Sequence, residues 1–292
     1  MHEGDNKLMP LTKTCSVALA ICTMMIAPSG SNADEFDVEA SAVAIFSAFS
    51  SVQQQQEAIN VQPDRVHEVQ DYLIALMRPH WGMDVGYLSD AVAEDAELPT
   101  GILLENMFTG TRAIITRDFG IDMYAAGEMV FRVKSENINN AQSREDVMAA
   151  LHSVIPAVRM TDRLLVDESQ HDTHLHTAAN LQIRLYVFGQ EIELNSETDW
   201  VETLSEVDIV LLDQNKIELT TSDTDHAHAH PVDAVLRLCR KLNSRGIQLK
   251  SGDVLGIGTW TGSHPVANIT RLAAVFDGLD PNQPVQVYMG FR

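Results

Sequence analysis

The sequence has few cysteines, few aromatic residues and few basic residues. Only 3 of its 292 residues are cysteine and 6% are aromatic, so a small domain held together by several disulfides is excluded. Lysine and arginine together number 20 against 41 aspartate and glutamate residues, which gives a formal net charge of −21. Nucleic acids and anionic membrane surfaces would repel such a chain, so we expect neither as a partner. The chain is nevertheless long, and its 45% of hydrophobic residues are enough to bury a core.

The first 33 residues differ in character from the remainder of the chain. Lys7 and Lys13 precede an apolar run, Cys15–Ala27, and the small residues Ser31 and Ala33 follow it. A basic start, a short apolar run and a small-residue cleavage site in this order are typical of a secretory signal peptide. The apolar run is shorter than the ~20 residues that a membrane-spanning helix needs.

We therefore expect a cleaved signal peptide at residues 1–33 and one exported domain, periplasmic or secreted, at residues 34–292. An uncleaved N-terminal helix on a cytoplasmic protein is the alternative interpretation. Cleavage removes two of the three cysteines and leaves Cys239, so an internal disulfide is not expected. No second apolar run reaches the length of a membrane span, so we expect no membrane association after cleavage.

Hydrophobic periodicity predicts many short strands and a few helices. The helices are expected within residues 35–60, from Pro63 to Pro79, from Ser143 to Pro156 and from Pro231 to Gly246. The strands are expected at Glu128–Val133, Ile183–Phe188, Asp208–Leu212, Ile217–Leu219, Gly252–Gly258 and Val285–Met289. Along the first of these strands, two-residue alternation places Glu128, Val130 and Arg132 on one face. Because strands and helices do not alternate regularly, we predict an α+β fold around an irregular β-roll.

Eight short segments occur in an order that is typical of one enzyme family. They are Val85–Ser89, Gly101–Met107, Ala126–Phe131, Val154–Val158, Thr177–Asn180, Ala229–Val235, Gly246–Val254 and Gly258–Gly262. In this order they resemble the 2-keto-4-pentenoate hydratase / 4-oxalocrotonate decarboxylase branch of the fumarylacetoacetate hydrolase superfamily, over roughly residues 60–292. The resemblance implies an irregular β-roll or barrel with flanking helices, and a hydratase or decarboxylase that acts on a small 2-oxo or 2-hydroxydienoic acid. It also implies a homo-oligomer, because members of the family are commonly oligomeric.

The resemblance also implies where a metal site should lie. Members of the family hold Mg or Mn with three carboxylates, and the ion chelates the carboxylate and the 2-oxo group of the substrate. In this sequence Glu128 is the one carboxylate retained, because Ala126 and Arg159 stand at the other two positions. The position of the family's lysine is Asp84, and the family's active-site asparagine matches Asn180. Asp84 and Asn180 are therefore the candidate catalytic residues.

The replaced residues change the expected chemistry. A guanidinium at Arg159 repels a cation, which makes a Mg or Mn site at Glu128 doubtful in this chain. Arg159 either forms an ion pair with Glu128 that fills the vacated site, or binds the carboxylate of a 2-oxo acid while Asn180 orients the substrate. Two functions follow: an enzyme with an altered or weakened metal site, or an exported, catalytically inactive pseudoenzyme that serves as a binding or assembly module.

Histidines offer a different metal chemistry. The two groups are His226, His228 and His230, and His171, His174 and His176. Imidazoles suit zinc, copper or nickel, and the first group would place three of them on one side of an extended segment. The simpler interpretation is a solvated loop that leads into the helix at Pro231, with His230 as a structural residue. The acidic run Asp90–Glu97 lacks the ligand spacing of a calcium loop, so we interpret it as solvated surface.

Overall fold

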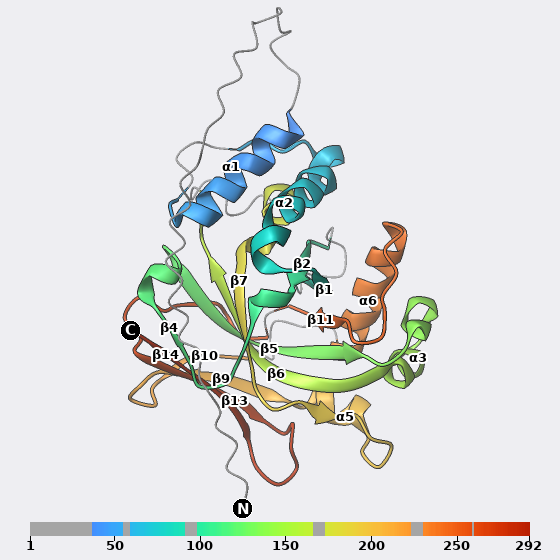
Figure 1. The fold of residues 1–292 in the computed structure, drawn as a ribbon. Helices are drawn as coiled ribbons and strands as arrows, with labels where there is room; N and C mark the ends of the chain where they lie inside the picture. The colour runs from blue at the N-terminus through green and yellow to red at the C-terminus, as the bar shows by residue number, and fades with distance from the viewer. Residues whose placement is uncertain (1–36, 55–58, 91–97, 166–172, 223–229, 259) are drawn as a thin grey trace, which may run out of the picture. The chain divides into compact units, whose positions relative to one another are not determined.

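The structure, a computed structural model, describes residues 37–54, 59–90, 98–165, 173–222, 230–258 and 260–292 (Figure 1). The predicted signal peptide, residues 1–33, lies outside these ranges. Residues 36–292 form one compact unit, and every element below belongs to it. Among the described residues, no helix combines the length and the apolar character needed to cross a bilayer.

Six α-helices lie within the described residues. They are α1 (Val38–Ser51), α2 (Val66–Trp81), α3 (Arg144–Ala150), α4 (Thr173–Ala178), α5 (Trp200–Ser205) and α6 (Pro231–Ser244). The prediction that α2 ends at Pro79 is wrong by two residues, because a proline in the last turn removes only one backbone hydrogen bond. Gly82 ends the helix instead, with a φ of 84° that favours glycine, and its N–H donates to the Arg78 carbonyl.

The predicted capping box at Ser143 is present, but the predicted helix after it is mostly a strand. The Ser143 side chain accepts the N–H of Asp146, whose carboxylate accepts the N–H of Ser143. Helix α3 nevertheless ends at Ala150, and strand β6 (Leu151–Asp162) follows at once, so the prediction of a helix to Pro156 is wrong. The apolar run in β6 is buried on both faces, a pattern that a central strand satisfies as well as a helix does.

Two sheets form the body of the unit. The first sheet follows the order β2-β1-β11-β5-β6-β7-β3, with β12 beside β5 and β8 beside β6; its strands are β1 (Asp84–Ser89), β2 (Thr100–Leu104), β3 (Phe108–Gly110), β5 (Met123–Val133), β6, β7 (Ile183–Phe188), β8 (Ile192–Glu193), β11 (Val254–Gly256) and β12 (His264–Pro265). The second follows the order β10-β9-β13-β14-β4; its strands are β4 (Ala113–Ile115), β9 (Asp208–Leu212), β10 (Glu218–Thr221), β13 (Arg271–Asp277) and β14 (Val285–Phe291). The strands β1 and β11, β3 and β7, and β4 and β14 pair in parallel, and the other pairings are antiparallel.

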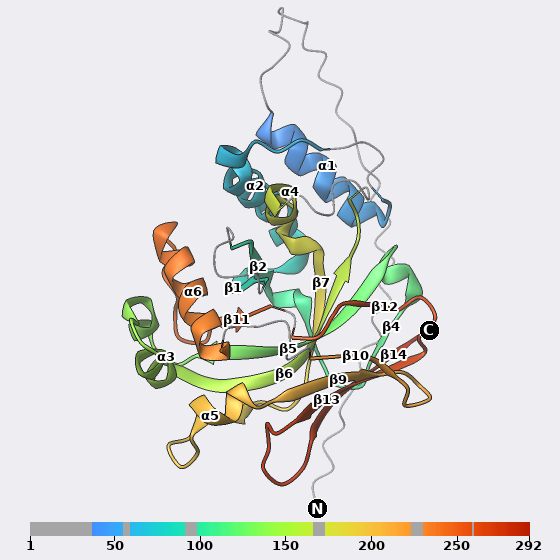
Figure 2. The ribbon, with the colours of Figure 1, turned by 180° about the vertical axis from the view of Figure 1, so that it is seen from behind.

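The first sheet is strongly curled and has a different core on each face (Figures 1 and 2). One core lies between this sheet and the second sheet and includes Met129 and Phe131 of β5. The other lies under helices α1, α2 and α4 and includes Val130 of β5 and Tyr186 of β7. Glu128 shares a face with Val130, as the alternation predicts. The α+β fold predicted from the sequence, a β-roll with flanking helices, is confirmed.

Candidate functional site

The register of three neighbouring strands brings the candidate residues together. Strands β5 and β6 are antiparallel, with Ala126 opposite Arg159 and Glu128 opposite Ala157. Glu128 and Arg159 are therefore diagonal neighbours on one face of the sheet. On the next strand, Tyr186 lies directly opposite Arg159. Three polar side chains from β5, β6 and β7 thus meet inside the core that the helices cover.

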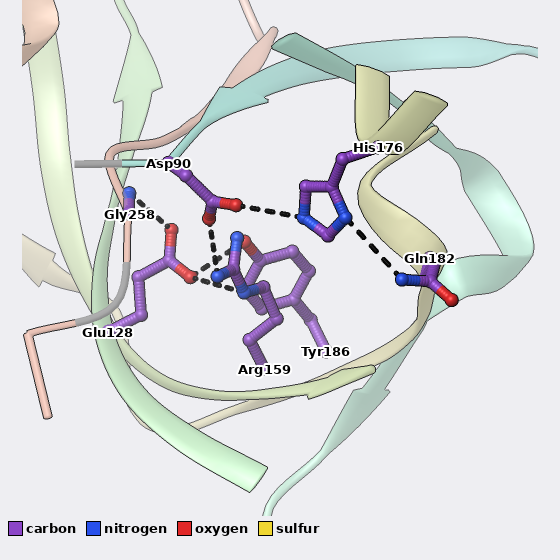
Figure 3. Close-up of polar contacts among 7 residues, drawn as sticks. All are labelled: Asp90, Glu128, Arg159, His176, Gln182, Tyr186 and Gly258. Carbon is purple, nitrogen blue, oxygen red and sulfur yellow. Dashed lines mark hydrogen bonds and ion pairs between the residues drawn. The ribbon is translucent and has the colours of Figure 1, made fainter. Parts of the chain in front are cut away.

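Glu128 is wholly buried, and its carboxylate has three polar neighbours (Figure 3). The Tyr186 hydroxyl donates to Oε2 at 2.9 Å, and the N–H of Gly258 donates to Oε1 at 3.2 Å. Arg159 Nε lies 3.5 Å from Oε2, an ion pair without a hydrogen bond. A Cβ at Gly256 would lie 2.8 Å from Oε1 and 2.7 Å from the Tyr186 hydroxyl, so these contacts require glycine there.

Arg159 lies between two carboxylates (Figure 3). Its side chain is 5% exposed, and Nη2 donates to Oδ1 of Asp90 at 2.6 Å. Nε and Nη1 are buried and have no hydrogen-bond partner among the described residues. The ion pair between Arg159 and Glu128 that the sequence offered as one alternative is present, but Asp90 provides the shorter contact.

The cluster continues from Asp90 to His176 and from there to the buried Gln182 (Figure 3). Oδ2 of Asp90 lies 3.2 Å from Nε2 of His176, and Nδ1 of His176 lies 3.4 Å from Nε2 of Gln182. The Asp90 and His176 side chains are 22% and 26% exposed, whereas Arg159 and Glu128 are buried. The cluster therefore runs from a buried carboxylate to two half-buried groups near solvent.

Burial and charge move the pKa values of the cluster in opposite directions. Burial raises the pKa of Glu128 to about 7, because the loose contact with Arg159 and the hydrogen bond from Tyr186 compensate only in part. Burial acts the same way on Asp90, but Arg159 and His176 outweigh it and hold the pKa of that carboxyl below its usual range. Burial, followed by the Glu128 charge, raises the pKa of Tyr186 well above its usual value. At neutral pH, Asp90 is ionised and Glu128 is partly protonated.

These residues do not fit a divalent metal ion. A guanidinium carries a fixed positive charge and has no lone pair for a cation, and Arg159 places it between the carboxylates of Glu128 and Asp90. Within the described residues, no group of three or more His, Cys, Asp or Glu side chains is placed to hold a metal. The chemistry of the cluster is therefore that of an arginine between carboxylates.

The structure does not bring Asp84 into the cluster. Asp84 begins β1 and accepts two hydrogen bonds from Arg78, at 2.9 and 2.8 Å. Asp90 follows the other end of the same strand, and six residues of strand span about 20 Å. A catalytic role for Asp84 stays a prediction, and these contacts favour a role in joining α2 to β1.

Asn180 is engaged with the backbone of a neighbouring strand. Its Oδ1 accepts the N–H of Ile102 at 2.7 Å, and its Nδ2 donates to the carbonyl of Ile102 at 2.9 Å. Gln70 Nε2 lies 3.4 Å from the same Oδ1. These contacts fasten the segment after α4 to β2, so the predicted catalytic and substrate-orienting roles of Asn180 stay predictions that the geometry does not support.

The alternative histidine site is only partly described. His226 and His228 lie outside the described residues. His230 caps α6: its Nδ1 accepts the N–H of Val232 at 3.1 Å, and its Nε2 donates to the carbonyl of Val201 at 2.7 Å. A metal bound at either ring nitrogen of His230 would replace one of these hydrogen bonds, which favours the structural interpretation of this histidine.

Asp90, His176 and Tyr186 belong to the cluster but were not among the predicted site residues. Asp90 was assigned to a solvated acidic run, although it directly follows the motif segment Val85–Ser89. His176 belongs to the second histidine group and directly precedes the segment Thr177–Asn180. Tyr186 lies within a correctly predicted strand, but only the pairing of β6 with β7 places it opposite Arg159. Proximity to the motif segments is the signal that could have identified the first two.

Comparisons with known proteins agree with the predicted fold. No family model matches the sequence, and the comparison with curated proteins gave no match. The 4-oxalocrotonate decarboxylase from Pseudomonas putida G7, complexed with magnesium and adipate, is similar with a TM-score of 0.74 and 18% identity, over 87% of this chain and 97% of that chain. A second structure of it, complexed with calcium and acetate, has a TM-score of 0.71 and 18% identity over the same shares.

A more distant structure belongs to the same superfamily. A protein from Yersinia pestis CO92 that is assigned to the fumarylacetoacetate hydrolase family has a TM-score of 0.51 and 15% identity, over 72% of this chain and 93% of that chain. These similarities show that the chain has the fold of the fumarylacetoacetate hydrolase superfamily. Divalent ions are present in the two decarboxylase structures. In this chain the Arg159 guanidinium lies between the carboxylates of Glu128 and Asp90.

Proposed function

We propose that the protein acts on a small 2-oxo acid, or the related 2-hydroxydienoic acid, and that Arg159 binds the substrate carboxylate without a divalent ion. The structurally similar decarboxylase is described with adipate in one structure and with acetate in another. Both of these ligands carry carboxylates. A small carboxylic acid is therefore the class of ligand that is found with a protein of this fold and that a guanidinium binds well.

The observation that carries the proposal is the incomplete hydrogen bonding of Arg159. The guanidinium is 5% exposed, and two of its nitrogens lack hydrogen-bond partners among the described residues. Buried, unsatisfied donors of a charged group are costly. A ligand carboxylate would accept from Nη1 in a charge-assisted hydrogen bond, which is the interaction that arginine forms best.

Glu128 is the group placed to transfer a proton. With a pKa of about 7, both of its protonation states are populated near neutral pH, as general acid–base catalysis requires. The Tyr186 hydroxyl and the Gly258 N–H hold the carboxylate in one orientation. Hydration of a 2-hydroxydienoic acid, or loss of a second carboxylate that is conjugated to the 2-oxo group, develops negative charge on the 2-oxo oxygen, and the nearby guanidinium of Arg159 would stabilise it.

The test is turnover of 2-hydroxypenta-2,4-dienoate and of a small 2-oxo acid by the purified protein, in EDTA and in added Mg or Mn. We expect the same rate in both, and a loss of about tenfold or more in kcat/KM for Arg159→Lys, because a charge-assisted hydrogen bond is lost. Arg144→Lys is the control, since Arg144 forms an ion pair of the same length, 2.6 Å, with Asp233 at a more exposed place outside the cluster. Turnover that EDTA abolishes and Mg restores would contradict the proposal.

A catalytically inactive binding module is the second candidate. The observation that favours it is the 2.6 Å ion pair between Arg159 and Asp90, which already occupies part of the guanidinium. Under this alternative, small carboxylates bind in an Arg159-dependent manner, and neither acid is turned over. The same assay, combined with a binding titration, therefore separates the two candidates.

A further inference from the structure

Asp90 occupies Arg159 in the way that a bound ligand would. The guanidinium presents its terminal nitrogens, Nη1 and Nη2, as a fork that matches a carboxylate. Nη2 donates to Asp90 Oδ1 at 2.6 Å, while Nη1 has no hydrogen-bond partner among the described residues. A ligand carboxylate can use both arms of the fork only when Asp90 has left it.

The second oxygen of Asp90 meets another carboxylate-binding group, His176. Oδ2 lies 3.2 Å from His176 Nε2. Gln182 Oε1 accepts the backbone N–H groups of Leu164 at 2.8 Å and Leu165 at 3.1 Å, so the amide Nε2 is the side that faces Nδ1 of His176. Nδ1 then accepts and Nε2 carries the proton, which makes His176 a donor to a carboxylate even when the ring is neutral.

The segment that holds His176 is built without Asp90. Asn180, Leu181 and Gln182 have φ values of 53°, 54° and 52°, three successive left-handed residues that are not glycine. This conformation costs about 1–2 kcal/mol per residue, so other contacts must maintain it. The Asn180 hydrogen bonds to β2 and the two hydrogen bonds to Gln182 Oε1 are such contacts. The Gln182 amide that faces His176 is therefore held in place independently of the Asp90 carboxylate.

Asp90 itself is held less firmly than its partners. Its side chain is 22% exposed, against 5% for Arg159. Its own N–H reaches the carbonyl of Pro99 at 3.4 Å, a long contact. Among the described residues, no backbone N–H donates to its carboxylate, which has Arg159 and His176 as partners. Of the three groups, Asp90 is the one that can leave at the lowest cost.

We propose that Asp90 is a displaceable internal ligand: it fills a carboxylate site formed by Arg159 and His176, and a small monocarboxylic 2-oxo acid binds by replacing it. This inference rests on the proposed function and adds His176 as a second binding residue and Asp90 as an autoinhibitory one. A binding-competent state populated at about 0.1–10% lowers the apparent affinity by about 10- to 1,000-fold. The wild-type protein should therefore bind small carboxylates more weakly than its own site allows.

The experiment is a calorimetric titration of the mature protein with pyruvate in the presence of EDTA. Asp90→Ala should bind pyruvate about tenfold or more tightly than the wild type, and Asp90→Asn, which keeps the size of the side chain, should lie between them. Asp233→Ala is the matched control: it also removes one negative charge and an ion pair of 2.6 Å with an arginine, but leaves the cluster intact. In the Asp90→Ala background, a further His176→Gln change should weaken binding by about three- to tenfold, because one hydrogen bond is lost.

The outcomes separate this inference from the proposed function. Equal affinity of the wild type and both Asp90 variants for pyruvate, with binding still dependent on Arg159, would overturn the internal-ligand proposal and leave the function standing. An equal gain in Asp233→Ala would also overturn it, because the effect would be one of overall charge. Absence of pyruvate binding to all variants, with unchanged melting temperatures, would overturn both.

Discussion

The first sheet contains two buried arginines, and their surroundings differ in kind. Arg184 of β7 lies against Asp162 of β6, which is 0% exposed; Nε donates to Oδ2 at 3.0 Å. The backbone N–H groups of Ile121 and Asp122 donate to the same carboxylate, and the guanidinium lies 3.9 Å from the centre of the Phe49 ring. Both oxygens of this carboxylate are thus satisfied by groups that the fold fixes.

Arg159 is equally buried, but its closest carboxylate partner is not fixed in this way. Its carboxylate partners are Glu128, held at 3.5 Å without a hydrogen bond, and Asp90, which is 22% exposed and lacks backbone donors among the described residues. Burial raises the pKa of Glu128 to about 7, although the charge of Arg159 acts in the opposite direction. Both guanidinium groups have buried nitrogens without a hydrogen-bond partner among the described residues, Nη2 in Arg184 and Nε and Nη1 in Arg159. The two sites differ in the carboxylate, because, in the part of the chain that the structure describes, backbone N–H groups fix Asp162 but not Asp90.

The largest expected effect is a loss of stability when the ion pair between Arg184 and Asp162 is broken. Asp162→Ala leaves the buried guanidinium of Arg184 without its partner and should lower the free energy of unfolding by about 3–5 kcal/mol. Asp90→Ala should lower it by a smaller amount, because Glu128 remains near Arg159 and the Asp90 side chain is itself 22% exposed. Urea denaturation of both variants measures the difference. Equal losses would break the distinction between a structural pair and a ligand site.

The next effect is a pH dependence of stability that arises from Glu128 in the Arg159 cluster and not from the Arg184–Asp162 pair. The pKa of Glu128 is raised from 4.5 to about 7, so the folded protein holds this proton more tightly than the unfolded chain does. The contribution of this proton to the free energy of unfolding is therefore greatest below pH 4.5 and is lost as the pH rises to about 7, a change of about 3.5 kcal/mol at ~1.4 kcal/mol per pKa unit.

Glu128→Gln keeps the shape of the side chain and removes this proton equilibrium. Urea denaturation between about pH 5 and pH 8 should show a flatter profile for the variant than for the wild type. The contribution of Asp90 lies outside this window. In the unfolded chain Asp90 is protonated near its ordinary pKa of 3.8, and in the folded protein its pKa is lower still. Its contribution to stability is therefore lost only as the pH falls below about 4. Parallel profiles for wild type and variant would show that Glu128 does not titrate as described.

The smallest expected effect is the loss of stability when the ring of Phe49, which lies against Arg184, is removed. Phe49→Leu keeps an apolar side chain in the core but removes the ring beneath Arg184, and should cost about 1–2 kcal/mol. The loss should shrink when Arg184 is replaced by methionine as well, since the two changes remove the same contact. Strictly additive losses in this double-mutant cycle would mean that the ring contributes only hydrophobic packing.

The fold and the position of Glu128 could be predicted from the sequence, because both depend on patterns within short segments. Two-residue alternation placed Glu128 correctly, and the ordered motifs indicated the superfamily. Strand β6 was mistaken in part for a helix, because an apolar run buried on both faces carries no period that distinguishes the two. The pairing of Arg159 with Tyr186 depends on the register of β6 and β7, which no local pattern specifies.

The histidine and carboxylate at the outer end of the cluster were missed for a different reason. Asp90 begins an acidic run, and composition assigns such runs to the surface. Its role depends on a guanidinium 69 positions along the chain and on His176, 86 positions along. Asn180 matches the motif, yet its side chain holds the backbone of Ile102. A matched motif residue can thus hold the scaffold together, while residues outside the matched positions join Glu128 in the cluster.

The central claim is that Arg159 binds a small carboxylate without a metal, at the place that Asp90 occupies in the free protein. A crystal structure of the protein grown in EDTA with saturating pyruvate tests it most directly. The account predicts the pyruvate carboxylate on Nη1 and Nη2 of Arg159, with one oxygen near His176 Nε2 and the Asp90 side chain turned away. Pyruvate bound elsewhere, or an Arg159–Asp90 pair unchanged from the free structure, would contradict it.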